Sequence, residues 1–246
     1  MEVHHHSHSS RKKWIHYFWE FLMLFLAVFC GFLAEYQLEH KIEKDKEKQY
    51  MISLVEDLHM DTTSLQDLYL LGEKQQAIAD TLIKTINNQQ LTSDIIKKIY
   101  LLSSNSTRVV NVGFENRTSS QLKNSGGMRL IRKKIVSDSI LSYWQQVEIC
   151  NSISSRLDFI AGARGDVYAR LFHNKYLIRD ASHMAPVSAI KEGASLISND
   201  PALLAEYSNR TYSRKGILNN YLSNMKWTKD KAVRLMEIIR KEYHVE

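Results

Sequence analysis

The chain has 246 residues, of which 44% are hydrophobic and 24% are charged, and this composition excludes a disordered chain. Only 9 glycines and 2 prolines are present, too few for the turns of a β-sandwich or β-barrel, so the sequence predicts an all-α fold. Lys and Arg exceed Asp and Glu by six, a mild and dispersed excess that argues against nucleic-acid binding.

Residues 1–13 are polar and contain a histidine tract of His4, His5, His6 and His8. Such a tract binds nickel or zinc loosely, and it is also typical of an added purification tag. We therefore expect a flexible, basic and His-rich tail that takes no part in the fold.

Residues 14–38 are predicted to form a transmembrane helix. The run from Phe21 to Ala34 contains no charged residue, and aromatic residues crowd its leading end, as they do at membrane interfaces. A cleaved signal peptide is the alternative, but a cut after Ala34 would place Phe32 where a small residue is required. The pattern therefore favours an uncleaved signal anchor.

Three residues of this segment are candidates for contacts between transmembrane helices. Glu20 lies near the interface, where a buried carboxylate has a partner or else extends toward the headgroups. Ala27 and Gly31 are four residues apart, and such small pairs permit close helix approach. The compact basic cluster at residues 11–13 predicts that the amino end is cytoplasmic.

Residues 39–61 are predicted to form a juxtamembrane stalk helix. Acidic and basic residues alternate from Glu35 to Lys48 with few apolar residues and no glycine or proline, a pattern typical of a helix held by charge pairs. Asp61 or Thr62 is expected to cap a second helix, which opens a helical bundle domain over residues 62–246.

The first helix of this domain is predicted by apolar residues that recur every three or four positions. Its stripe consists of Leu65, Leu68, Leu71, Gln75, Ile78, Leu82 and Ile86. A shorter helix is expected over residues 92–102, then an irregular zone over 103–114. A short helix over 115–123 should end at Gly126 and Gly127, which suit a helix end with positive φ.

The longest helical pattern covers residues 128–177. Cys150 lies on its apolar stripe and is expected to be a buried structural thiol. A loop over residues 180–193 follows, and a last helix should begin after Asp200 and Pro201, a cap followed by a first-turn proline. Together these helices predict an elongated antiparallel bundle that follows the membrane and stalk helices.

The sharpest metal-binding candidate is the group Glu56, His59 and Asp61. Glu56 and His59 have the Glu-x-x-His spacing that places two ligands on one helix in di-iron bundles. Such bundles require a second pair, and outside residues 1–13 no other glutamate has a histidine three residues later. A metal-binding bundle or metal-dependent enzyme using these three residues is therefore an alternative hypothesis.

Other chemistry is not indicated by the sequence. It has no glycine-rich phosphate loop and no strained turn that would present a nucleophile. Its two cysteines, Cys30 and Cys150, are too few for a cysteine zinc site. The sequence thus predicts no catalytic residue, no cofactor and no small-molecule substrate, and we expect a protein that is not an enzyme.

Two stretches carry a resemblance to a known family. Residues 19–58, WEFLMLFLAVFCGFLAEYQLEHKIEKDKEKQYMISLVEDL, and residues 119–131, SSQLKNSGGMRLI, resemble a family of uncharacterised single-pass membrane proteins from Bacteroidota. The resemblance implies an anchor in the bacterial inner membrane and a helical domain in the periplasm. Because the family is a domain of unknown function, it assigns no catalytic residues.

The sequence therefore predicts a non-enzymatic, single-pass membrane-anchored protein. It would act as a scaffold, sensor or accessory subunit through helix–helix contacts, either as a homo-oligomer or with a partner protein in a membrane complex. Binding of its basic surface to anionic lipid or polysaccharide is a further hypothesis.

Overall fold

The computed structural model describes residues 10–88, 90–106, 108, 110–179 and 186–245. The histidine tract therefore lies outside the described residues. The chain divides after Tyr50 into two compact units, and the second unit, Met51–Glu246, contains the core. Most of the described chain is helical, which confirms the predicted all-α class.

The first helix, α1, runs without a break from Ser10 to Asn88. The predicted start of a second helix at Asp61 or Thr62 is therefore wrong. Asp61 accepts hydrogen bonds from other segments instead of capping its own helix. The Thr62 hydroxyl donates to the carbonyl of His59 at 2.8 Å, a bond typical of a threonine inside a helix.

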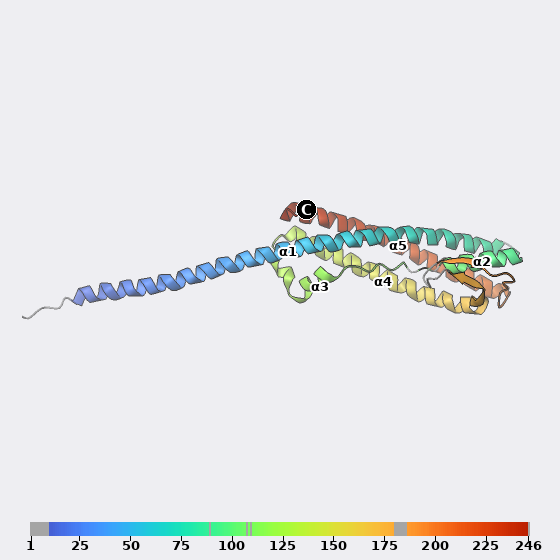
Figure 1. The fold of residues 1–246 in the computed structure, drawn as a ribbon, viewed down its shortest axis with the longest axis horizontal. Helices are drawn as coiled ribbons and strands as arrows, with labels where there is room; N and C mark the ends of the chain where they lie inside the picture. Colours follow the sequence, from blue (N-terminus) through green and yellow to red (C-terminus); the bar gives the residue numbers. More distant parts are fainter. Residues whose placement is uncertain (1–9, 89, 107, 109, 180–185, 246) are drawn as a thin grey trace, which may run out of the picture. The chain divides into compact units, whose positions relative to one another are not determined.

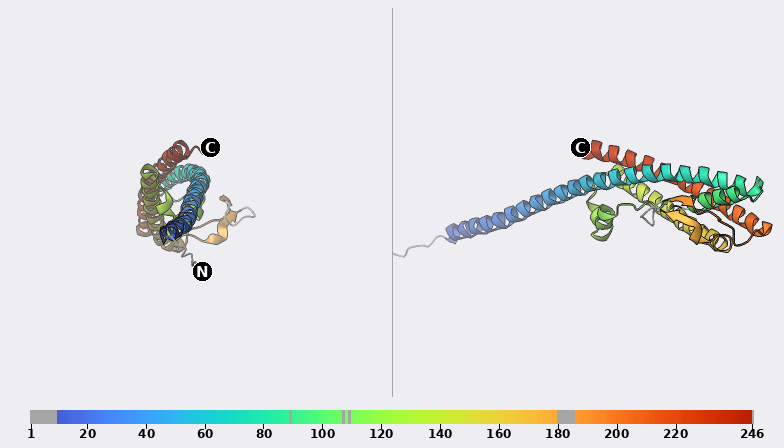
Figure 2. Two further views of the ribbon diagram at one scale, coloured as in Figure 1. Left: turned by 90° about the vertical axis from the view of Figure 1, so that its left-hand side faces the viewer. Right: turned by 45° about the vertical axis from the view of Figure 1, so that its right-hand side comes forward.

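Three long helices form the second unit: residues 51–88 of α1, α4 (Lys134–Leu171) and α5 (Pro201–Tyr243). α5 runs antiparallel to both of the others (Figures 1 and 2). Hydrogen bonds across the α4–α5 interface follow this direction, since Gln146 bonds to Asn224 and Arg164 bonds to Thr211. The predicted antiparallel bundle is confirmed.

Two short helices lie between α1 and α4 in the chain. α2 (Ser93–Asn105) is capped by Thr92, whose side chain accepts from the N–H of Ile95, and α3 (Arg117–Asn124) precedes Gly126, which has a φ of 66°. Both predicted helices are confirmed. A 3₁₀ turn, η1 (Gly127–Leu130), follows.

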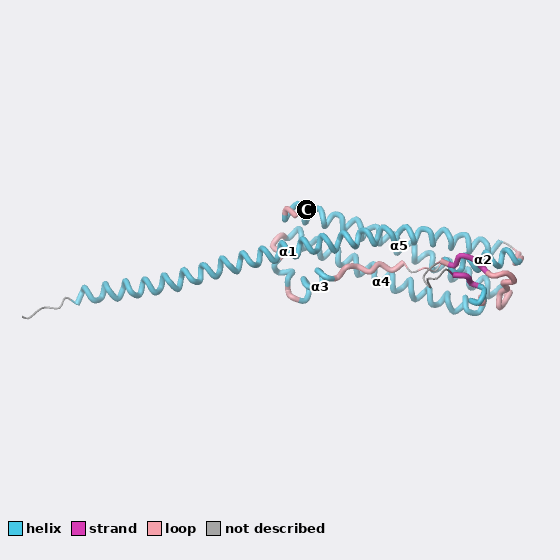
Figure 3. The backbone as a smooth tube through the Cα atoms, in the orientation of Figure 1, coloured by secondary structure: helices cyan, strands magenta, loops and turns pink. Residues whose placement is uncertain are grey.

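The described residues between α2 and α3 form a segment without helix or strand that runs along the long helices (Figure 3). Val110 and Val112 are buried in it. The Val112 N–H donates to the hydroxyl of Tyr221 in α5 at 3.2 Å, so the segment satisfies a backbone donor with a side chain. The predicted irregular zone over residues 103–114 begins too early, because α2 continues to Asn105. The described residues after α2 are irregular in secondary structure, and Val110 and Val112 among them are buried.

The predicted helix over residues 128–177 is too long at both ends. α4 stops at Leu171 because Phe172 adopts an extended conformation and pairs with Leu196. A turn, η2 (Asn174–Tyr176), leads into β1 (Leu177–Arg179), which pairs antiparallel with β2 (Val187–Ile190). β2 lies within the segment predicted to be a loop, of which residues 180–185 are outside the described chain.

The core of the second unit includes two clusters of buried residues. One lies in its central part, and the other lies at the end that carries α2 and the antiparallel pair β1–β2. The end cluster contains Tyr100, Phe172 and Tyr207, whose rings pack edge to face. The central cluster contains Cys150, which is fully buried as predicted. The Thr228 hydroxyl lies 3.6 Å from its sulfur, and burial raises the pKa of this thiol, so the unreactive thiol form is favoured.

Candidate functional site

The transmembrane candidates all lie on the apolar part of α1. Among the described residues, α1 is the one helix that is long and apolar enough to cross a membrane, and its apolar stretch is not buried in the protein. Glu20 lies 3.6 Å from His16 one turn earlier. Ala27 and Gly31 are exposed and one turn apart, and a side chain at Gly31 would meet no atom within 4 Å. Their role in helix contacts remains a prediction.

The structure does not bring Glu56, His59 and Asp61 together as metal ligands. Glu56 and His59 are exposed, and Glu56 forms an ion pair with Arg117 at 3.1 Å. Asp61 is 2% exposed, and its two carboxylate oxygens accept hydrogen bonds from other groups. Within the described chain, no group of three His, Cys, Asp or Glu side chains is placed to hold a metal ion.

Asp57 and Asp61 instead anchor the neighbouring chain segments to α1. Asp57 pairs with Arg117 at 2.7 Å and accepts the N–H of Thr118 at 2.9 Å. Asp61 accepts the N–H of Glu115 at 2.8 Å and the hydroxyl of Tyr143 in α4 at 2.5 Å. Two carboxylates one turn apart thus fix the start of α3 and one turn of α4 against α1.

Burial dominates the electrostatics of this network. It raises the pKa of Asp61, and the hydrogen bonds from Tyr143 and Glu115 oppose it only in part. Burial and the adjacent carboxylate of Asp61 also raise the pKa of Tyr143. The tyrosine therefore stays protonated and donates to Asp61, so the pair stabilises the packing of α4 against α1.

A cavity of about 270 Å³ lies beside this network, between α1, α3 and α4. Its lining combines carboxylates, hydroxyls, amides and aromatic rings. The lining residues are Leu54, Asp57, Leu58, Asp61, Phe114, Glu115, Asn116, Ser119, Ser120, Lys123, Tyr143, Trp144, Val147, Glu148 and Asn151. The Lys123 ammonium lies over the ring of Trp144, 4.6 Å from its centroid.

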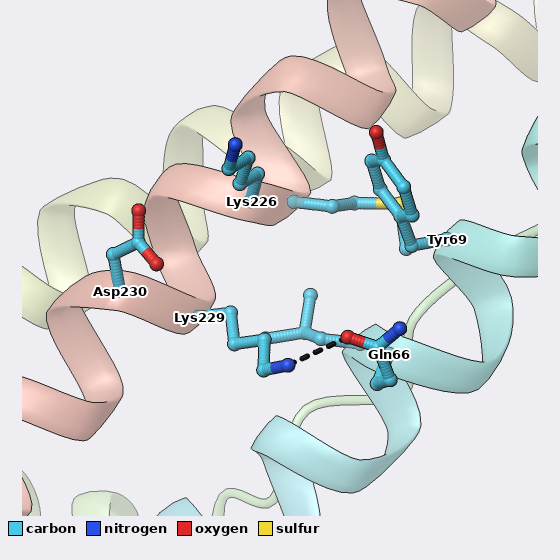
Figure 4. Close-up of a pocket in the computed structure, with 7 residues that line it drawn as sticks. Gln66, Tyr69, Lys226, Lys229 and Asp230 are labelled. Carbon is cyan, nitrogen blue, oxygen red and sulfur yellow. Dashed lines mark hydrogen bonds between the residues drawn. The ribbon is translucent and has the colours of Figure 1, made fainter.

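A second cavity, of about 200 Å³, lies between α1 and α5 (Figure 4). Lys229 extends from α5 toward α1 and donates to the side chain of Gln66 at 2.6 Å. Tyr69, Lys226 and Asp230 also line it. A hydrogen bond to Glu73 raises the pKa of Tyr69, so this phenol stays protonated. The lining contains no activated nucleophile, and we assign no reaction to it.

Two buried arginines were not predicted from the sequence. Arg164 in α4 and Arg214 in α5 are 2% and 5% exposed and bond to carbonyl, hydroxyl and amide oxygens. Burial and the charge of Arg164 lower the pKa of Arg214 to about 10. Their spacing from buried leucines is the sequence signal that could have indicated their burial. Arg164 is seven residues after Leu157, and Arg214 is four residues before Leu218, so each lies on the same helix face as that leucine.

Comparison with known proteins gives no assignment. A scan against protein-family models finds no match, and searches of curated proteins and of solved structures find no similar protein. The resemblance to Bacteroidota membrane proteins therefore remains a prediction from residues 19–58 and 119–131.

Proposed function

We propose that this protein is a single-pass membrane-anchored helical protein that acts without catalysis, as a scaffold, sensor or accessory subunit. The exposed apolar segment of α1 carries this proposal. Its Phe and Leu side chains would each gain about 1.5–3 kcal/mol on leaving water. A continuous apolar surface of this kind requires a bilayer or another protein to cover it.

The continuity of α1 supports a retained anchor over a cleaved signal peptide. The helix continues through Ala34, where a signal peptidase would have to cut, and on into the bundle. A cut after Ala34 would also leave residues 51–88 in the mature protein, so the support for retention comes from the unbroken helix at Ala34. We propose that the amino end is cytoplasmic and that the bundle faces the periplasm of a bacterium, in keeping with the basic cluster before the span and the family resemblance.

Helix–helix contacts are the proposed mode of action. In the membrane, Ala27 and Gly31 would allow close approach of a second helix, and Glu20 would require a polar partner there if it did not reach the interface. Outside the membrane segment, large apolar side chains such as Phe159 and Trp227 are 76% and 60% exposed. They offer additional points of contact with another chain.

Extraction of the full-length protein in a mild detergent, through a carboxyl-terminal tag, tests this proposal. Copurifying proteins are identified, and light scattering gives the mass of the particle. A stoichiometric partner would support an accessory subunit, and a defined homo-oligomer would support a self-associating scaffold or sensor. A monomer without a partner, or a mature protein that begins near Glu35, would refute the proposal.

The transmembrane contacts are tested by two variants in the same preparation. Gly31→Leu places a large side chain at the proposed close approach and should lower the particle mass. Phe29→Leu changes an apolar residue on the opposite side of the helix from Ala27 and Gly31 and should leave the mass unchanged. Equal masses for the wild type and Gly31→Leu would contradict a helix interface at Ala27 and Gly31.

A further inference from the structure

The cavity between α1, α3 and α4 is lined by both buried and exposed side chains. Asp57, Asp61, Tyr143 and Trp144 are buried, whereas Glu115 and Glu148 are exposed. Ligand pockets in proteins begin at roughly 300 Å³, so a cavity of about 270 Å³ would fit only a small ligand. The lining residues belong to the second unit, so this cavity is formed independently of the membrane segment.

The charges around the cavity favour a cation. Four carboxylates line it, from Asp57, Asp61, Glu115 and Glu148, against the single ammonium of Lys123. Arg117 neutralises Asp57, and Asp61 is held by its two hydrogen bonds. Glu115 and Glu148 remain as the carboxylates available to a ligand. This acidic lining contrasts with the chain as a whole, which carries a net charge of +6.

An aromatic surface gives the cavity its second recognition element. The Lys123 ammonium lies over the face of Trp144 at 4.6 Å, within the distance at which a cation is attracted to an aromatic ring. Indole is the strongest of the natural ring partners for a cation. The chain's own lysine thus shows that an ammonium group fits this ring face.

We infer that this cavity binds a small organic cation, a primary amine or short diamine, whose ammonium group takes the face of Trp144 that Lys123 covers. The exposed carboxylate of Glu148 would pair with the ligand, and the side-chain oxygens of Asn151, Ser119 and Ser120 would accept hydrogen bonds from its N–H groups. A metal ion is a poorer fit, because the described carboxylates do not converge into a group that could ligate one.

Replacing Lys123 distinguishes a cationic ligand from an anionic one, because the two would respond with opposite changes in affinity. If the ligand is a cation, Lys123 competes with it for the ring and repels it, so Lys123→Met should tighten binding. If the ligand is an anion, Lys123 is its only cationic contact in the lining, and the same change should abolish binding. Lys123 is exposed, so its replacement is not expected to unfold the protein.

The experiment is calorimetric titration of the full-length protein in dodecyl maltoside micelles with putrescine. 1,4-Butanediol serves as the uncharged analogue and succinate as the anionic one. We expect putrescine alone to bind. A cation–π contact at an exposed site contributes about 0.5–1 kcal/mol, so Lys123→Met should tighten putrescine binding about two- to five-fold.

Two acidic substitutions separate this site from general attraction of polyamines to acidic side chains. Glu148→Gln should weaken putrescine binding at least about two-fold, whereas Glu237→Gln, an exposed position of α5 outside the cavity, should leave it unchanged. Circular dichroism confirms that each variant is folded. Absence of putrescine binding, equal binding of butanediol, weaker binding by Lys123→Met, or equal effects of the two glutamine variants would each overturn the inference.

Discussion

Gly72 is the position where α1 and α5 approach most closely among the glycines of the described helices. A Cβ added there would overlap Cδ2 of Leu222 and lie 3.3 Å from its Cγ. Carbon atoms attract best at about 3.5–4.0 Å, so the leucine must move, although it is only 4% exposed. We therefore expect Gly72→Ala to destabilise the bundle.

The magnitude follows from two opposing effects. Alanine is favoured over glycine inside a helix by about 1 kcal/mol, whereas overpacking a core costs about 1–3 kcal/mol. The net expectation is a loss of about 1 kcal/mol in the free energy of unfolding. Gly216→Ala is the matched control, because this exposed glycine of α5 has no atom within 4 Å of an added Cβ, and it should gain up to about 1 kcal/mol.

Urea unfolding of the full-length protein in micelles, followed by circular dichroism, measures both changes. The two variants should differ by about 2 kcal/mol. Leu222→Ala should cost less in the Gly72→Ala background than in the wild type, because it removes the clash as well as the packing. Equal stabilisation by Gly72→Ala and Gly216→Ala would refute the close approach of α1 and α5 at this point.

The same unfolding assay tests three further positions. Asp61→Ala should lower the free energy of unfolding by about 1–3 kcal/mol, because it leaves the buried Tyr143 hydroxyl without its acceptor. An unchanged free energy of unfolding in Asp61→Ala would contradict this. Burial raises the pKa of Asp61 above its ordinary value of 3.8, so between pH 3.8 and the folded pKa the folded protein binds more protons than the unfolded one. The contribution of Asp61 to the free energy of unfolding should therefore fall as pH rises through this range. Asp61→Asn should remove this part of the pH dependence of stability. Lys229→Met should change the free energy of unfolding by less than about 1 kcal/mol, because it exchanges one hydrogen bond to Gln66 for apolar packing between α1 and α5. A larger loss would contradict this and would show that the hydrogen bond holds α1 to α5. Arg214→Lys should cost about 1–3 kcal/mol, since a lysine cannot reproduce the two directed bonds that its guanidinium makes, and an unchanged urea midpoint would contradict it.

The elements that the sequence predicts well are those decided locally. Thr92 and Asp200 accept hydrogen bonds from the N–H groups of the turns that follow them, and Gly126 adopts the positive φ that it was expected to supply. The apolar stripe that contains Cys150 indicates which face of α4 is buried. Each of these features depends on a few residues of one segment, so spacing alone reveals it.

The errors arise where a residue bonds to a distant segment. Asp61 is a good cap residue by type, but its carboxylate is used by Glu115 and Tyr143, and nothing near Asp61 in the sequence shows this. The Glu56–His59 spacing is real, yet Arg117 takes the position of a cation beside Glu56. Helix spacing indicated two ligands on one face but could not reveal what faces them.

The cavity beside Trp144 could not be predicted for the same reason. Lys123 and Trp144 belong to different helices, and the carboxylates at residues 57–61 come from a third. In the sequence, residues 57–61 belong to the end of the predicted stalk helix, and no spacing relates them to Lys123 or Trp144. Only the packing of α3 against α1 and α4 combines them into one acidic and aromatic surface.

Polar residues on the apolar stripes explain how the long helices find one register. Apolar stripes alone would permit α1 and α5 to slide by whole turns, since one leucine replaces another at little cost. Gln66 bonds to Lys229 and Gln75 bonds to Arg214, so a slide of one turn would leave Gln75 and the buried Arg214 without each other. Leaving a buried hydrogen-bonding group without a partner costs about 1–3 kcal/mol, so we expect these bonds to favour one alignment. We therefore expect the departures from the apolar pattern at positions 75 and 214 to favour a single register of α1 and α5.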